Sequence, residues 1–353
     1  MMRSSGLMLL LLIPLLVLMP FGLLMTLLNV SRGSAKMTQS TNNLKQIGLG
    51  FHSYNDTANM LPYNGGTIVA KDLAAINFGW HNPNVRDSGT WASQILPFLE
   101  QDNLYRNIIP TGTANDKVPE WLTNKANNAN WQVGVKTYIC PGRERTGFKT
   151  DMGKDCYPGP VTDYAINVFL NSAPTTYGQL ANKQNGFATN GGLPVEKNNR
   201  ATIQGIADGS NNTIMVGSKA LPPAYFNDNK ATHWDEGIFS PGNYLAADEK
   251  STITSTGTGR GHLVSPEVAG EDQKERPKIG GVPWIWKDSE LIANEVEKKA
   301  IPEYAMDWGT PFNKGILFLW GDGTVRVMSH KIRGSINFAR MLYPADGAVV
   351  VFD

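Results

Sequence analysis

The longest hydrophobic pattern of the chain lies at its N-terminus, where residues 7–28 contain no charged side chain. A helix of that length would be about 33 Å long, which is enough to cross a hydrocarbon core of about 30 Å. The segment has no polar stripe of the kind that a helix buried in a protein core normally presents. It therefore predicts a transmembrane helix, kinked at Pro14 and Pro20.

The processing of this helix is open between three alternatives. The helix can be retained as an anchor, or it can be a signal peptide cleaved near the small residues Gly33 and Ala35. It can also be cut between Gly6 and Leu7, because a short basic leader that ends in glycine before a long apolar helix is typical of prepilins. Prepilins usually carry glutamate at the fifth mature position, and Leu11 stands there in this chain.

Helical character continues past the apolar segment. Four apolar side chains recur at i, i+3, i+7 and i+10, which places them on one helix face. They are Leu44, Ile47, Phe51 and Tyr54. The pattern predicts a stalk helix that packs on a head domain and ends by Asn59. The expected organisation is a leader at 1–6, a transmembrane helix at 7–28, an amphipathic stalk helix at 29–59 and a β-rich head at 60–353.

Within the head, residues 316–328 predict a β-hairpin, because two apolar runs flank the turn sequence Gly321-Asp322-Gly323. Around Pro97, residues 91–105 predict a short helix pair. Further strands are expected at 135–139, 162–170, 214–217 and 348–352, helices at 118–126 and 332–342, and surface loops at 178–199 and 251–281. The fold class expected from these elements is α+β.

Composition adds a location to this picture. The chain has 32 Lys and Arg against 31 Asp and Glu, so nothing indicates a basic surface for nucleic acid. Its 36 Gly, 21 Pro and many Asn favour an extracytoplasmic β-rich domain. Basic residues follow the apolar segment, so the positive-inside rule does not itself place the head outside the cytoplasm. Outside the cytoplasm, Cys140 and Cys156 would form a disulfide, whereas in the cytosol they would be two reduced thiols.

Two groups of polar residues could hold a ligand. Asp208, Asn211 and Asn212 offer oxygen ligands for Ca²⁺, although Asp-Gly sequences of this kind also form ordinary turns. His233 stands beside Asp235 and Glu236, an arrangement more typical of a solvated charge group in a loop than of a metal site.

Trp284 and Trp286 alternate as on one strand face, so they could line a carbohydrate groove or pack in the core. The sequence contains no nucleophile elbow, metalloprotease motif, phosphate-binding loop or paired catalytic carboxylates. We therefore expect neither enzymatic activity nor a cofactor. An extracytoplasmic hydrolase would have no catalytic residues to explain it.

Six sequence blocks, in order, resemble a large bacterial family of uncharacterised pilin-like proteins. The blocks are TNNLKQIGL at 41–49 with HSYND at 52–56, Trp91 with ILPFLEQ at 95–101, ICP at 139–141, TDY at 162–164, IADGSNNTI at 206–214 and DGTVR at 322–326. The resemblance covers about residues 35–343. It implies a type IV pilin-like architecture, in which a long N-terminal helix packs on an antiparallel sheet.

Three positions depart from the pattern of that family. The histidine of its H-x9-DG element would fall at Phe312, and its cysteine before the NNLKQ block is replaced by Ser40 or Thr41. Leu11 stands in place of the glutamate that pairs with a neighbouring subunit in pilin filaments. The resemblance therefore implies a structural subunit of the bacterial cell envelope, single-pass in the inner membrane with its head in the periplasm or at the surface. Its expected partners are the lipid bilayer and other subunits bound through the N-terminal helix; the alternative is an anchored module that binds a polysaccharide or solute.

Overall fold

A computed structural model of the chain defines the stalk helix and the core of the head. It describes residues 4–62, 89–107, 133–151, 153, 157–167, 170, 202–232, 234–240, 258–260, 284–291 and 307–342, with the side chains of the first helix described from residue 31 onward. The predictions for 118–126, 178–199 and 348–352 lie outside these residues.

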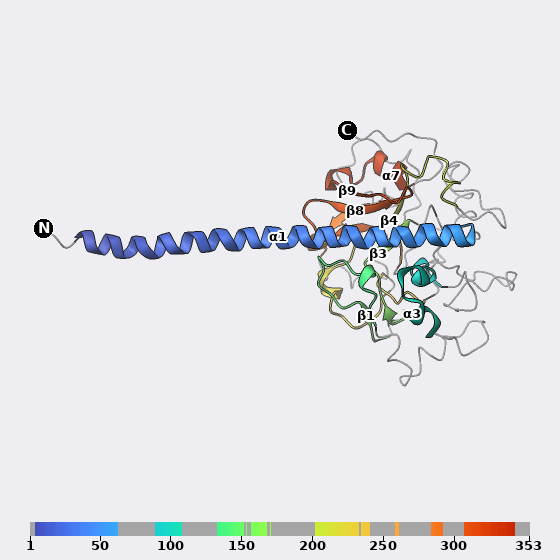
Figure 1. Ribbon diagram of the computed structural model, residues 1–353, viewed down its shortest axis with the longest axis horizontal. Helices are drawn as coiled ribbons and strands as arrows, with labels where there is room; N and C mark the ends of the chain where they lie inside the picture. Colours follow the sequence, from blue (N-terminus) through green and yellow to red (C-terminus); the bar gives the residue numbers. More distant parts are fainter. Residues whose placement is uncertain are drawn as a thin grey trace.

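One helix, α1 (Ser4–Ala58), contains 55 residues and runs without interruption from the N-terminus through the head. At about 1.5 Å per residue it is roughly 80 Å long. Figure 1 shows its N-terminal half extending away from the head and its C-terminal half lying across the head. The helix ends where expected, because Asn59 adopts a left-handed conformation with φ of 54°.

The central sheet has five strands in the order β5-β3-β4-β8-β9. Four of them, β3, β4, β8 and β9, pair antiparallel, and β5 joins the edge of β3 in parallel. The strands are β3 (Tyr164–Asn167), β4 (Ile214–Ser218), β5 (Gly259–Arg260), β8 (Ile316–Trp320) and β9 (Val325–Met328). The predicted α+β fold, with the long helix packed on an antiparallel sheet, is confirmed.

Alternation along β8 gives the sheet two apolar faces. Leu317 and Leu319 join the core cluster that also contains the buried side chains of α1. Ile316, Phe318 and Trp320 point to the other face, where they join the cluster of the C-terminal helix α7 (Ile336–Leu342). The sheet is therefore covered by α1 on one side and by α7 on the other.

The remaining elements are short. They are α2 (Trp91–Gln94), η1 (Leu96–Leu99), α3 (Asp102–Asn107), η3 (Lys136–Tyr138), η4 (Pro223–Tyr225), η6 (Asp288–Glu290), η9 (His330–Ile332) and the paired strands β1 (Phe148–Lys149) with β2 (Gly159–Pro160) and β6 (Ile285–Lys287) with β7 (Trp308–Thr310). The hairpin predicted at 316–328 is formed by β8 and β9, and Gly323 in its turn has φ of 81°. The broken helix predicted at 91–105 is also present as α2, η1 and α3.

Two local predictions were wrong. Residues 135–139 do not form a strand, because Lys136–Tyr138 winds into the 3₁₀ helix η3. This turn directs Tyr138 into the core, where its hydroxyl donates to the Ala92 carbonyl oxygen at 2.6 Å. The predicted loop at 251–281 contributes β5, and the Thr258 carbonyl oxygen before this strand accepts a 2.8 Å hydrogen bond from the buried Trp91 indole.

Candidate functional site

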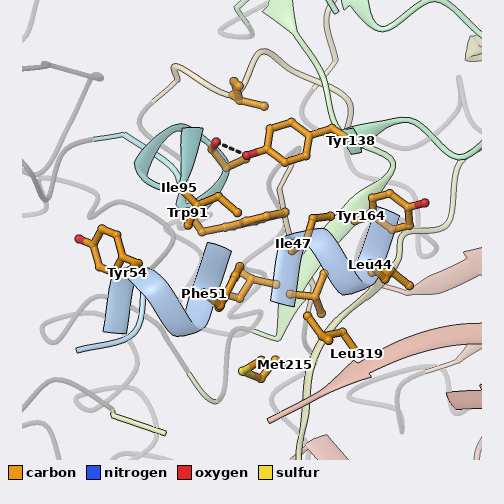
Figure 2. Close-up of a cluster of buried hydrophobic side chains, with 14 of the residues drawn as sticks. Leu44, Ile47, Phe51, Tyr54, Trp91, Ile95, Tyr138, Tyr164, Met215 and Leu319 are labelled. Atoms are coloured by element: carbon orange, nitrogen blue, oxygen red, sulfur yellow. Dashed lines mark hydrogen bonds between the residues drawn. The ribbon is translucent and has the colours of Figure 1, made fainter. Parts of the chain in front are cut away.

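The C-terminal half of α1 docks in the head through the apolar stripe predicted from the sequence. Leu44, Ile47, Phe51 and Tyr54 are at most 1% exposed. Figure 2 shows side chains of this stripe in one cluster with Trp91, Ile95, Tyr138, Tyr164, Met215 and Leu319. Each fully buried side chain of this size contributes about 1.5–3 kcal/mol, so the stripe is sufficient to hold the stalk in the head.

Small residues bring the helix close to the sheet. A Cβ atom added at Gly48 would lie 2.9 Å from Cδ1 of Leu319, so only glycine fits here without a shift of that side chain. Two residues later, and so on nearly the opposite side of the helix, Gly50 faces Ile95 of the turn after α2, and a Cβ atom added there would lie 3.3 Å from the Ile95 Cδ1 atom. The sequence IGLG therefore provides two flat patches on which neighbouring elements of the head rest.

Polar contacts fix the register of the helix against the loop around residue 140. The Asn43 amide donates to the Ile139 carbonyl oxygen at 2.9 Å, and Lys36 forms an ion pair with Glu144. Between them, Ser40 Oγ lies 3.3 Å from Cys140 Sγ, and both side chains are fully buried. Ser40, rather than Thr41, is therefore the residue of this pair that faces Cys140.

Cys140 overturns one prediction. It is a free thiol within the described part of the chain, so the expected disulfide with Cys156 is not formed; Cys156 itself lies outside the described residues. Burial raises the pKa of the Cys140 thiol to about 11. The side chain is a packed, protonated thiol at the boundary between stalk and head, and a thiol of this kind is chemically inert.

Behind this loop lies a network of buried charges that no sequence motif had indicated. Its side chains are at most 4% exposed. They are Arg143, Arg145, Lys149, Lys219, Asp163, Asp235 and Asp288. The members come from five separate segments of the chain, so the network connects elements that are distant in sequence.

Arg143 is at one end of this charge network. Its Nε and Nη2 atoms contact the two oxygens of Asp288 at 2.8 and 3.1 Å, and Nη1 donates to Asp163 at 2.9 Å. Asp163 also accepts from the Cys140 backbone N–H at 2.7 Å. The guanidinium is therefore bound on every edge, and the carboxylate of Asp163 links it to the loop that receives the stalk.

Asp235 is at the other end. Arg145 donates to its two oxygens at 2.6 and 3.0 Å, and the same guanidinium donates from Nε to Asp163 at 2.8 Å. Lys219 and Lys149 lie 3.0 and 3.2 Å from the Asp235 carboxylate. The interpretation of Asp235 as part of a solvated charge group was therefore wrong, since this side chain is completely buried among three cations.

Protonation states follow from these contacts. Burial alone would raise the pKa of Asp235, but Arg145 and the two lysines outweigh burial and hold the pKa well below its ordinary value. The same balance, with Arg145 and Arg143 as the cations, lowers the pKa of Asp163. At Asp288 burial prevails over Arg143 and raises the pKa. Asp163 and Asp235 are thus ionised at neutral pH, and their negative charges neutralise the arginines and lysines of the network.

Such an arrangement can stabilise one packing of the head. Removing one partner of a buried ion pair typically costs about 3–5 kcal/mol, because the other charge stays buried without compensation. Among the residues that the structure describes, no three His, Cys, Asp or Glu side chains are placed to hold a metal ion. The ion pairs of the network thus connect five segments of the head to one another.

The residues predicted for a calcium site form a turn. The Asn212 amide donates to the Asp208 carbonyl oxygen at 2.9 Å, and Gly209 has φ of 90°. Asn211 is exposed, and a Cβ atom at Gly209 would lie 3.0 Å from its Oδ1 atom. The arrangement matches the turn alternative that the sequence left open.

The two tryptophans lie side by side next to β7. Their ring centroids are 6.2 Å apart, and Trp284 is 8% exposed. Trp286 is half-buried, and its indole N–H donates to Asp307 at 2.8 Å. Arg333 covers the Trp284 ring at 5.1 Å from its centroid. His233, proposed with them as a binding residue, lies outside the described residues.

The predicted processing site and membrane helix belong to the first half of α1. Gly6 and Leu7 lie in its first turn, and residues 7–28 are helical in backbone. In the part of the chain whose side chains the structure describes, no helix is long and apolar enough to span a bilayer. Residues 7–28 are outside that part, so the transmembrane helix stays a prediction.

Sequence reasoning missed the charge network, although one signal was present. The motif ICPGRER places Arg143 and Arg145 two residues apart, directly after the loop that receives the stalk. Two arginines that follow a buried cysteine are costly to bury unless carboxylates neutralise them. The carboxylates come from residues 163, 235 and 288, and their proximity depends on the tertiary fold.

These features together define a class of protein: an α+β head that packs on the second half of one long helix and contains a buried network of charged side chains. Within this class, the chain belongs to the family of proteins of unknown function DUF1559, whose profile matches residues 31–334. No curated protein and no solved structure matches it.

Proposed function

We propose that this protein is a membrane-anchored, pilin- or pseudopilin-like structural subunit of the bacterial cell envelope, without enzymatic activity. In this proposal the N-terminal half of α1 sits in the inner membrane and the head lies on the periplasmic or outer side. The observation that carries the proposal is the division of α1. Its apolar stripe at 44–54 is buried inside the head, whereas the uncharged segment at 7–28 extends beyond the head.

A helix of this composition outside the head requires an apolar environment. About twenty uncharged, mostly apolar residues are stable in lipid or in a bundle with helices of other subunits, and are insoluble in water. The absence of the pilin glutamate at Leu11 favours an anchor that stays in the membrane over conventional filament assembly. A rigid head suits a structural subunit, and the buried ion pairs hold the segments of this head in one arrangement.

N-terminal sequencing of the mature protein, combined with membrane fractionation, tests the proposal. We expect the protein to sediment with membranes, to require detergent for release, and to begin at Met1 or, after prepilin-type processing, at Leu7 with a methylated amine. Cross-linking in intact membranes should then give oligomers that depend on the first half of α1. A soluble protein that begins near residue 36 would show that the segment is a cleaved signal peptide and would refute the anchor.

A polysaccharide- or solute-binding module is the alternative. The structure offers it little support, because Trp284 is almost buried and the indole N–H of Trp286 is occupied by Asp307. Glycan-array binding that disappears in Trp286→Ala, but persists in a variant of an exposed residue such as Lys45→Ala, would establish the module instead.

A further inference from the structure

Three basic side chains are exposed at the end of the head from which the N-terminal half of α1 emerges. They are Arg32 on α1, Lys314 in the loop before β8 and Lys331 in η9. None of them forms an ion pair within the described part of the chain. Beside Arg32, the Glu144 carboxylate forms an ion pair with Lys36, and Lys36 together with Arg32 lowers the Glu144 pKa. These three residues, the basic collar, therefore give this end of the head an excess of positive charge.

Two contacts place the collar on one level. Lys314 Nζ lies 3.4 Å from Ser34 Oγ, so the loop before β8 is level with residue 34 of the helix. His330 Nε2 lies 3.3 Å from the Phe312 carbonyl oxygen, which holds η9 against the same loop. In Figure 1, β8 and β9 accordingly lie towards the side where α1 leaves the head.

The position of the collar along α1 sets its distance from a membrane. The predicted apolar segment ends at residue 28, and six further residues reach Ser34, a rise of about 9 Å along the helix. This equals about one Debye length at physiological salt, about 8 Å. Positive side chains at that height, with long flexible stems, can reach the phosphates of lipid headgroups.

We propose that Arg32, Lys314 and Lys331 bind the headgroups of anionic phospholipids and so hold the head in a fixed orientation on the bilayer surface. This inference rests on the proposed anchoring of α1. The head alone provides few charges, but α1 already holds them at the surface, so a small number of contacts is sufficient. Lysine ammonium groups act as point charges toward phosphate, and the arginine guanidinium can bind two phosphate oxygens at once.

The test uses the full chain reconstituted into vesicles of neutral phosphatidylcholine, or of phosphatidylcholine with about one-third phosphatidylglycerol. Flotation first reports insertion, and hydrogen exchange over residues 312–316 and 329–334 then reports contact of the collar with lipid. We expect slower exchange on the anionic vesicles, by up to about five-fold for each charge engaged. The protection should disappear in 0.5 M salt, because the attraction is screened.

A charge-matched pair of variants makes the test specific. Lys314→Gln/Lys331→Gln should exchange on anionic vesicles as the wild type does on neutral ones. Lys45→Gln/Lys136→Gln removes two exposed lysines that lie further from the bilayer, and should retain the protection. Failure to float would overturn the anchoring and this inference together. Flotation with equal exchange on both vesicle types, or protection that persists in Lys314→Gln/Lys331→Gln, would overturn the lipid contact alone.

Discussion

Replacing Ser40 by cysteine should lock the stalk to the head. Ser40 Oγ and Cys140 Sγ are 3.3 Å apart and fully buried, so Ser40→Cys brings a second sulfur directly opposite the first. A disulfide requires about 2.05 Å between sulfurs, a distance that small rotamer changes can provide from this starting point. The variant is best made together with Cys156→Ser, which removes the only other thiol of the chain.

The expected increase in the free energy of unfolding is large because the disulfide closes a long loop. The two residues are 100 positions apart, and a loop of about 100 residues corresponds to roughly 4.7 kcal/mol of lost entropy in the unfolded chain. Strain in the folded state reduces that figure, so we expect about 2–4 kcal/mol. At about 2–4 °C per kcal/mol for a domain of this size, the oxidised variant should melt roughly 10 °C above its reduced form.

Thiol titration in denaturant, after oxidation of the folded protein, and melting with and without reductant measure the two effects. Because oxidised and reduced samples of one variant are compared, packing changes caused by the mutation cancel. Thr41→Cys is the matched control, since the Thr41 hydroxyl donates back to the Met37 carbonyl oxygen along the helix and should not reach Cys140. Two titratable thiols in oxidised Ser40→Cys, or a bond formed equally well from position 41, would show that the register of α1 against the head is wrong.

Three further changes probe the head. Asp235→Asn should lower the free energy of unfolding in urea by about 3–5 kcal/mol, because the cationic partners of Asp235 stay buried. The pKa of Asp235 is depressed, so the carboxylate stabilises the fold above the unfolded pKa of about 4, and this stabilisation is lost as the pH falls through the folded pKa. The variant should therefore lose less stability below about pH 4 than the wild type. Phe51→Ala should cost about 3–5 kcal/mol in thermal unfolding, against less than about 0.5 for the exposed Leu49→Ala. Gly217→Ala should cost about 1–3 kcal/mol or more by the same assay, since its Cβ would lie 2.3 Å from the Phe318 ring; a melting temperature equal to that of the wild type would contradict the close packing at this strand.

The sequence was a good guide wherever local periodicity decides structure. The stripe from Leu44 to Tyr54 predicted which face of α1 is buried, and the Asp322-Gly323 turn predicted the hairpin of β8 and β9. Both depend on neighbours within about ten residues. The prediction for residues 135–139 failed because Val135, Tyr138 and Ile139 are too few apolar positions to distinguish a strand from a turn around the buried Tyr138.

The candidate site could not be predicted in the same way. Asp235 has no local feature that distinguishes a solvated carboxylate from one that neutralises Arg145, because its partner is 90 residues away. The disulfide prediction failed for a similar reason. The spacing of the two cysteines suggested a short closed loop, whereas the actual neighbour of Cys140 is Ser40, which is brought there by the docking of the helix.

Because α1 is continuous, the length of the segment between residues 28 and 34 sets the rotation of the head about the helix axis as well as its distance from the apolar segment. No turn or break separates the part outside the head from the part inside it. One residue inserted there would rotate the whole head by about 100° around the helix axis and raise it by about 1.5 Å. Four residues would raise it by about 6 Å but return it to within about 40° of its original facing. Whatever holds the first half of the helix therefore also sets the direction in which the head faces.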